Sequence, residues 1–167
     1  LISSQRIKYS RNDKKELWVM YIKHHFSQLA LEEHITQAML DSVFKNIVGS
    51  DVRINDDGSL LLSFAAYAAH PTFFSSSIAF ANSLLGPSYN YEPPKICFEN
   101  GEPLPEWLFA ECRIKTLAFT TNINWVSGDI ILIDNTRVMH GRRKIIDSDR
   151  RIYTALGFLS EEDRSHA

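Results

Sequence analysis

The chain has 167 residues, of which 44% are hydrophobic, and its formal net charge is −2. This length suffices for one domain with a sizeable core but is short for two, so we expect a single domain over residues 1–167. The near-neutral charge does not favour a nucleic-acid partner, and no apolar run reaches the roughly 20 residues that a membrane helix needs.

The cysteines and the start of the chain bear on where the protein resides. Cys97 and Cys112 do not form a C-x-x-C motif, so we expect two reduced core thiols rather than a zinc site or a disulfide framework. The first residues also lack the basic, apolar and small-residue segments of a signal peptide. These features predict a cytoplasmic protein. The first residue is Leu1, not Met, which indicates that an N-terminal segment of the same protein is missing.

Alternating and helical spacings divide the first part of the chain into one strand and two helices. The loose alternation in residues 1–15 predicts an edge strand that runs into a solvated loop, and its basic residues suit a solvated edge. Apolar residues at helical spacing predict amphipathic helices over residues 15–26 and 35–44. Three histidines lie on or beside these helices, and we assign them no metal ligation because none has a partner at ligand spacing: His24, His25 and His34.

Turn signals organise the middle of the chain. Asp56-Asp57-Gly58 predicts the turn of a hairpin between strands at residues 52–54 and 60–64. The three prolines within residues 86–94 predict a loop. Apolar spacing over residues 104–117 predicts a helix that docks beside the final strands.

The strongest strand signal lies near the end of the chain. The run from Ile130 to Ile133 is apolar, is β-branched except for Leu132, and has turn residues on either side. It therefore predicts a strand that is buried on both faces. A second strand is predicted over residues 151–158, after a polar turn. We also expect Trp125 to be a core residue and Asn135 to close the turn after the first of these strands. The short strands and peripheral helices indicate a mostly β barrel or sandwich with helical cover.

Two side chains beside these strands have the chemistry of a metal and carboxylate site. A histidine at the end of a buried strand, such as His140, can be a metal ligand, although a core histidine bonded to a backbone carbonyl has the same sequence signature. Arg151 lies in the return strand, where its guanidinium can bind a carboxylate through two hydrogen bonds. Arg150 would point to the opposite face of that strand. The arginine favours the ligand interpretation of His140.

These residues resemble the C-terminal signature of a known family, the taurine dioxygenase-like, iron(II)- and 2-oxoglutarate-dependent oxygenases, including members of the syringomycin biosynthesis type. The signature comprises Trp125, Gly128-Asp129, Asp134-Asn135, His140-Gly141-Arg142 and Arg151. Weaker similarities occur at residues 80–83 and 100–104. The resemblance covers most of the chain, and its specific motifs lie within residues 125–151.

The resemblance implies a double-stranded β-helix, or jelly-roll, that is incomplete at its N-terminus and binds iron(II) through two histidines and one carboxylate. His140 would be the distal histidine, and Arg151 would bind the far carboxylate of 2-oxoglutarate. Molecular oxygen would be the co-reactant, and the substrate would be a small or carrier-tethered amino-acid derivative. Asn82 and His70 either line the substrate pocket or cap turns, and Arg142 binds either a substrate carboxylate or Asp134.

The sequence departs from the family pattern at the other two metal ligands. The family has a His-x-Asp/Glu motif before the distal histidine, and none of the six histidines here has a carboxylate residue two positions later. The resemblance implies that this motif lies in the missing N-terminal segment. A carboxylate there would indicate a hydroxylase, and a small residue that leaves room for chloride would indicate a halogenase. Loss of the whole motif would leave a metal-free jelly-roll binding module.

Overall fold

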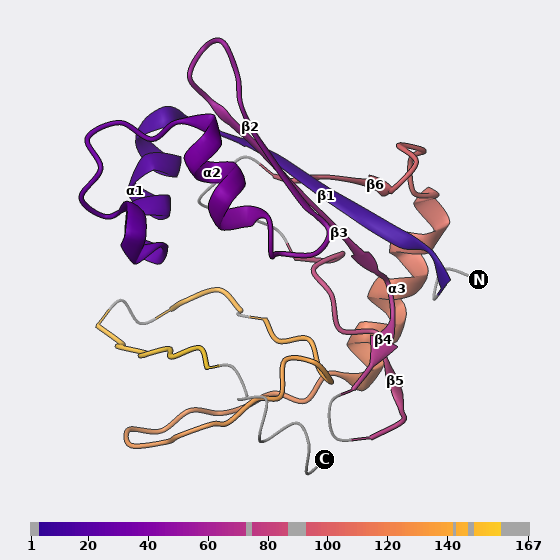
Figure 1. Cartoon of the computed structure of the whole chain (residues 1–167). Coiled ribbons are helices and arrows are strands. Elements are labelled where there is room, and N and C mark those ends of the chain that lie inside the picture. Colours follow the sequence, from indigo (N-terminus) through magenta and orange to yellow (C-terminus); the bar gives the residue numbers. More distant parts are fainter. Residues whose placement is uncertain (1–3, 73–74, 87–92, 142, 147–148, 158–167) are drawn as a thin grey trace.

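The computed structural model of the chain (Figure 1) describes residues 4–72, 75–86, 93–141, 143–146 and 149–157. Its elements, in chain order, are β1 (Arg6–Asp13), α1 (Lys15–His25), the short 3-10 helix η2 (Ser27–Leu29), α2 (Gln37–Phe44), β2 (Ser50–Ile54), β3 (Leu60–Tyr67), β4 (His70–Pro71), β5 (Ile78–Ala79), β6 (Lys95–Phe98) and α3 (Glu106–Phe119). The described residues from 120 onward form turns and segments without helix or strand. None of the described helices combines the length and apolar character of a membrane span.

The centre of the fold is an antiparallel four-stranded sheet in the order β2-β3-β1-β6. β1 pairs with β3 from Arg6 opposite Tyr67 to Asp13 opposite Leu60, and its other edge pairs with β6. The strand predicted at the start of the chain therefore forms, but its predicted position at a sheet edge is wrong. Arg6 and Lys8 alternate with Ile7 and Tyr9, so these two basic side chains lie on one face of a strand that is paired on both sides.

β2 and β3 form the hairpin that the Asp56-Asp57-Gly58 turn signal predicts. The Gly58 amide donates a hydrogen bond to the Asn55 carbonyl at 2.9 Å. The carboxylate of Asp57 accepts hydrogen bonds from the Ser59 hydroxyl at 2.6 Å and the Ser59 amide at 2.9 Å, and these bonds lower the pKa of Asp57. The turn satisfies its own polar groups, which is why a short stretch of sequence is enough to predict it.

Two helices cover one end of the sheet, while α3 lies at the other end (Figure 1). α1 and α2 bury Trp18 and Leu40 against Val52 and Leu60 of the hairpin. The indole Nε1 of Trp18 also donates a hydrogen bond to the Gly58 carbonyl at 3.0 Å. Both predicted helices are confirmed, and their apolar stripes account for this placement because each stripe needs an apolar surface to cover.

α3 packs at the other end of the same sheet face. Residues paired across an antiparallel sheet point to the same side, and the register places Ile7 and Phe98 on the face that also carries Leu60. Ile7 is fully buried in a second cluster with Leu84 and with Leu108 of α3. The helix predicted in this region forms, but it docks against β1 and β6 rather than beside the final segments of the chain.

The two strands predicted near the end of the chain are not formed. Residues 130–133 and 151–157 have no strand partner within the described part of the chain, and residue 158 lies outside it. Ile130 is 94% exposed and Leu132 is 99% exposed, so the predicted burial on both faces is wrong. A strand obtains its hydrogen bonds and its covered faces from neighbouring strands, and an apolar sequence does not supply these by itself.

The sheets explain which part of the predicted fold class is confirmed. β4 and β5 form a separate two-stranded sheet beside the four-stranded one, and neither described sheet closes into a barrel. A β-rich fold with a few helices is compatible with this arrangement, whereas the jelly-roll stays a prediction. Trp125, predicted to be a core residue, is 41% exposed because it lies in the segment that lacks strand partners. Most of the loop predicted over residues 86–94 lies outside the described residues.

Gly49 lies at a close approach between the start of β2 and the strand β3. Its φ angle is +83°, and its carbonyl accepts a hydrogen bond from the Ala65 amide at 2.8 Å. The guanidinium of Arg6 donates to the Ala65 carbonyl, also at 2.8 Å. A Cβ atom added at Gly49 would lie 2.3 Å from the Ala65 carbonyl oxygen. Both the backbone angle and the available space therefore require glycine here.

We expect Gly49→Ala to destabilise the protein more than Gly101→Ala. Gly101 has a φ angle of +91° with open space around its Cβ position, so both variants incur the roughly 1–2 kcal/mol cost of a left-handed alanine. Only Gly49→Ala adds the clash with Ala65, for which a further 1–3 kcal/mol is a reasonable order of magnitude. Chemical denaturation measures both free energies of unfolding. Equal losses would show that the contact with Ala65 is not as close as described.

Candidate functional site

Two local turns bracket the apolar run at residues 130–133. In the first turn, the Asp129 amide donates to the Val126 carbonyl at 3.1 Å, and the Val126 amide donates to Asp129 Oδ2 at 2.9 Å. Gly128 has a φ angle of +95°, which this tight turn requires. The predicted turn at Gly128-Asp129 is therefore present. Its hydrogen bonds join residues three apart and need no contact with the rest of the fold.

The second turn is built on Asp134 and leads toward His140. The Asp134 carbonyl accepts hydrogen bonds from the Arg137 amide at 3.1 Å and the Val138 amide at 3.3 Å. Its Oδ1 atom accepts from the Thr136 hydroxyl at 2.7 Å and the Thr136 amide at 2.9 Å. The hydroxyl bond is the main cause of the lowered pKa of Asp134, to which the charge of Arg137 also contributes. Asp134 closes the turn with its side chain, the role predicted for Asn135.

One oxygen of Asp134 is left without a partner. Its Oδ2 atom is shielded from solvent and makes no hydrogen bond with the described residues. Arg142, which was predicted to pair either with Asp134 or with a substrate carboxylate, lies outside the described residues. Both alternatives for Arg142 therefore stay predictions.

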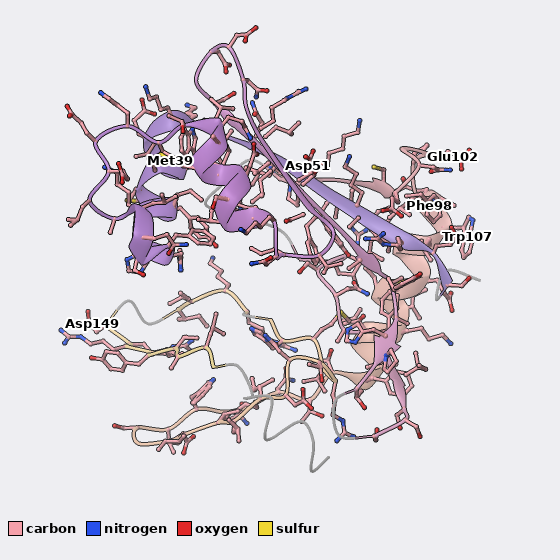
Figure 2. The ribbon with its side chains drawn as sticks, in the orientation of Figure 1. Met39, Asp51, Phe98, Glu102, Trp107 and Asp149 are labelled. Carbon is pink, nitrogen blue, oxygen red and sulfur yellow. The ribbon has the colours of Figure 1, made fainter. Side chains whose placement is uncertain are left out.

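His140 and Arg151 both lie in the segment without strands, and both are exposed. No described ion pair involves either side chain. Figure 2 labels Asp149, two positions before Arg151, on the opposite side of the view from Trp107 at the start of α3. The proposed roles of His140 and Arg151 remain predictions in this arrangement.

His70 and Asn82 are engaged in backbone contacts beside the second core cluster. The ring nitrogens of His70 lie 3.2 Å from the Pro71 carbonyl and 3.3 Å from the Ala81 carbonyl. Asn82 donates to the Ala68 carbonyl at 2.9 Å, and its Oδ1 accepts from the Leu84 amide at the same distance. Within the described part of the chain, no contact brings these two side chains to the other candidate residues. A role in a substrate pocket therefore stays a prediction.

Tyr9 carries a buried polar atom that sequence patterns do not single out. Its hydroxyl has no hydrogen-bond partner among the described residues, and its ring packs against the second core cluster. Burial raises the pKa of Tyr9 to about 12, while the Ser83 backbone acts in the opposite direction. In the sequence, Tyr9 has the pattern of an ordinary inward-facing residue in an alternating strand. No described contact connects Tyr9 to His140 or Arg151.

Two open hollows on the described surface also lie away from the candidate residues. One, of about 310 Å³, is lined by Gln5, Arg6, Phe98, Glu99 and Asn100. The other, of about 300 Å³, is lined by residues 41, 44, 45 and 47–52. Neither hollow includes a residue predicted to bind metal, cosubstrate or substrate.

A comparison with protein families decides the relationship that the motifs suggested. The family model described as "Taurine catabolism dioxygenase TauD, TfdA family" matches residues 64–156, more than half of the chain. The chain belongs to this TauD/TfdA family. No curated protein and no solved structure matches the chain. The match runs from β3 to the end of the motif-bearing segment and includes His140 and Arg151, so the family resemblance predicted from sequence is confirmed.

Membership of the TauD/TfdA family places the chain in the iron/2-oxoglutarate oxygenase superfamily. Members of the TauD/TfdA family typically depend on iron(II) and 2-oxoglutarate. Such a metal is held by several imidazole and carboxylate ligands that converge on one point. The described residues contain no group of three or more His, Cys, Asp or Glu side chains that could hold a metal ion. The described part of the chain therefore does not fit the metal site that the family implies.

The turn on Asp134 gives a test of its local hydrogen bonds. Replacing Thr136 by Val removes the hydroxyl donor, so we expect Thr136→Val to raise the pKa of Asp134 toward its ordinary value. Because the pKa of Asp134 is lowered in the turn, its ionised carboxylate stabilises the turn at neutral pH. This stabilisation is lost as the pH falls through the lowered pKa. A carboxyl-detected NMR titration measures the change.

Thr120→Val is the matched control for this titration. The Thr120 hydroxyl donates to the Thr116 carbonyl at 2.6 Å and not to a carboxylate, so its loss should leave Asp134 unchanged. If Thr136→Val also leaves the pKa of Asp134 unchanged, the described turn does not persist in solution.

Proposed function

We propose that this chain contributes half of the active site of an iron(II)- and 2-oxoglutarate-dependent oxygenase. The reaction is the hydroxylation of an amino acid or an amino-acid-derived metabolite, either free or tethered to a carrier. The family match over residues 64–156 is the observation that carries this proposal. It supports the oxygenase class, whereas the substrate rests on analogy within the family. The chemistry supplied by the bound iron and cosubstrate would be the activation of molecular oxygen.

Two side chains of this chain have assigned roles in the proposal. His140 supplies one imidazole ligand to iron, and Arg151 binds the carboxylate of 2-oxoglutarate that is remote from the metal. A guanidinium suits this second task because its fixed geometry can donate two parallel hydrogen bonds to a carboxylate. The Arg151 side chain is exposed and has no ion pair with another described residue, so a carboxylate has access to it.

The remaining two metal ligands are proposed to come from an N-terminal segment of the same protein. The basis is the donor inventory: no histidine of this chain begins a His-x-Asp/Glu motif. A carboxylate at the last position of that motif would complete a hydroxylase. A small residue there would leave a coordination position for chloride and indicate the related halogenase.

Replacing Arg151 by Ala should weaken 2-oxoglutarate binding in the intact protein by about 2–5 kcal/mol, because the carboxylate loses its charged partner. Isothermal titration of the iron-loaded protein with 2-oxoglutarate measures the affinity. Arg150→Ala is the matched control, since it removes the same charge from the neighbouring position. Unchanged affinity in Arg151→Ala, or an equal loss in both variants, would contradict a specific role for Arg151.

Replacing His140 by Ala should abolish iron-dependent consumption of 2-oxoglutarate by the intact protein, because one of the metal ligands is lost. His34→Ala is the control, because its side chain is 86% exposed and it lies between η2 and α2 in the chain, outside the family motif. The measurement is 2-oxoglutarate consumption with and without added iron(II). Full iron-dependent turnover in His140→Ala would remove this histidine from the metal site.

A further inference from the structure

The described residues divide into a packed part and a segment held by local contacts. Residues 4–119 contain every described helix and strand and both core clusters. In residues 121–157, the described backbone hydrogen bonds join residues only three or four apart. This second segment includes His140 and Arg151. In Figure 1 it runs as an open, orange-to-yellow trace away from the sheet.

Side-chain exposure shows the same division. Leu40 and Ile7 in the packed part are completely buried, whereas Leu132 and Ile146 in the segment are 99% and 95% exposed. Within the apolar run, Ile130 is 94% exposed, whereas Ile131 is half-buried. The side of the run that carries Ile130 and Leu132 is therefore uncovered. Apolar side chains of this kind normally drive a segment into a core. Here Ile130 and Leu132 do not help to hold the segment in place.

Two turns are the hydrogen-bonded parts of this segment. The turn at residues 126–129 and the turn on Asp134 are closed by hydrogen bonds between residues within a five-residue stretch. They fix where the chain changes direction on either side of residues 130–133. They do not fix the distance between His140 and Arg151, because that distance depends on how the extended parts pair.

We infer that the described residues from 120 onward do not fold together with the described residues up to 119, and that this chain by itself binds neither iron(II) nor 2-oxoglutarate in a defined site. The inference rests on the proposed function, which assigns the ligand roles to His140 and Arg151. A metal or a small dicarboxylate contacts only a few side chains, and it would have to order the whole segment in order to bring them together. The two turns would persist, while the extended parts would stay unpaired.

Hydrogen exchange of the full chain, measured by mass spectrometry or NMR, tests the inference directly. We expect amides of β1 and β3 to be strongly protected, and amides in residues 130–133 and 151–157 to exchange within about tenfold of the rates of an unstructured peptide. Adding iron(II) and 2-oxoglutarate under anaerobic conditions should leave this pattern unchanged. Protection of both segments, with or without the ligands, would overturn the inference, as would saturable binding of one iron(II) per chain that His140→Ala removes.

A pair of identical substitutions gives an independent measurement. Leu132→Ala should change the melting temperature of the chain by less than about 2 °C, because the side chain is exposed and unpacked. Leu40→Ala should lower it by about 5 °C or more, because it leaves a cavity in the first core cluster. Similar losses in the two variants would show that residues 130–133 are part of a packed core, and the inference would fail.

The outcomes separate this inference from the proposed function. If the chain alone binds iron(II) through His140, the inference fails while the proposed oxygenase role gains support. If the chain alone shows no protection of residues 130–133 and 151–157 and no binding, the inference holds, and the oxygenase role is then decided by 2-oxoglutarate consumption in the intact protein.

Discussion

The pairing of β1 with β3 on one edge and with β6 on the other is the interaction on which both cores depend. β1 links the hairpin, which carries the helices α1 and α2, to the strand against which α3 packs. The register puts the residues that build the two clusters on one face of the sheet, so a single strand aligns both. Arg6 reinforces the end of this strand, because its guanidinium contacts the Ala65 carbonyl at 2.8 Å and Glu99 at 2.9 Å.

The segment that carries the family motifs lacks an equivalent of this pairing. Ordering a residue costs about 1–2 kcal/mol of backbone entropy, and burying a large apolar side chain returns about 1.5–3 kcal/mol. That return requires a surface to pack against, and the described residues offer none to Ile130 and Leu132. The entropy term therefore prevails at residues 130–133, although all four of these residues are apolar. For the same reason, a single hydrogen-bonded contact of Arg151 with a carboxylate could not order the segment.

The features predicted correctly from sequence are those that short stretches of chain determine. The hairpin turn at residues 56–58, the two helices around Trp18 and Leu40, and the turn at Gly128 each depend on neighbours within a few residues. The central position of β1 and the unpaired state of residues 130–133 depend on which strands lie beside them, and periodicity does not encode that. The family signature was also recognisable from sequence, because it consists of residue types at fixed spacings. Whether His140 lies beside residues that could hold a metal with it depends on long-range assembly, which fixed spacings do not encode.

The turn on Asp134 shows how a segment without strands can still be prepared for a site. Its bonds to Thr136, Arg137 and Val138 lie within five residues, so they hold without a neighbouring strand. If strands of an N-terminal segment pair with residues 130–133, only the extended parts have to be ordered, because the turn that leads toward His140 already exists. Local preorganisation of this kind lowers the entropy cost of assembly. The family motif is thus divided into turn residues that are held by local hydrogen bonds and the proposed ligand residues, His140 and Arg151, which lie in segments without strand pairing.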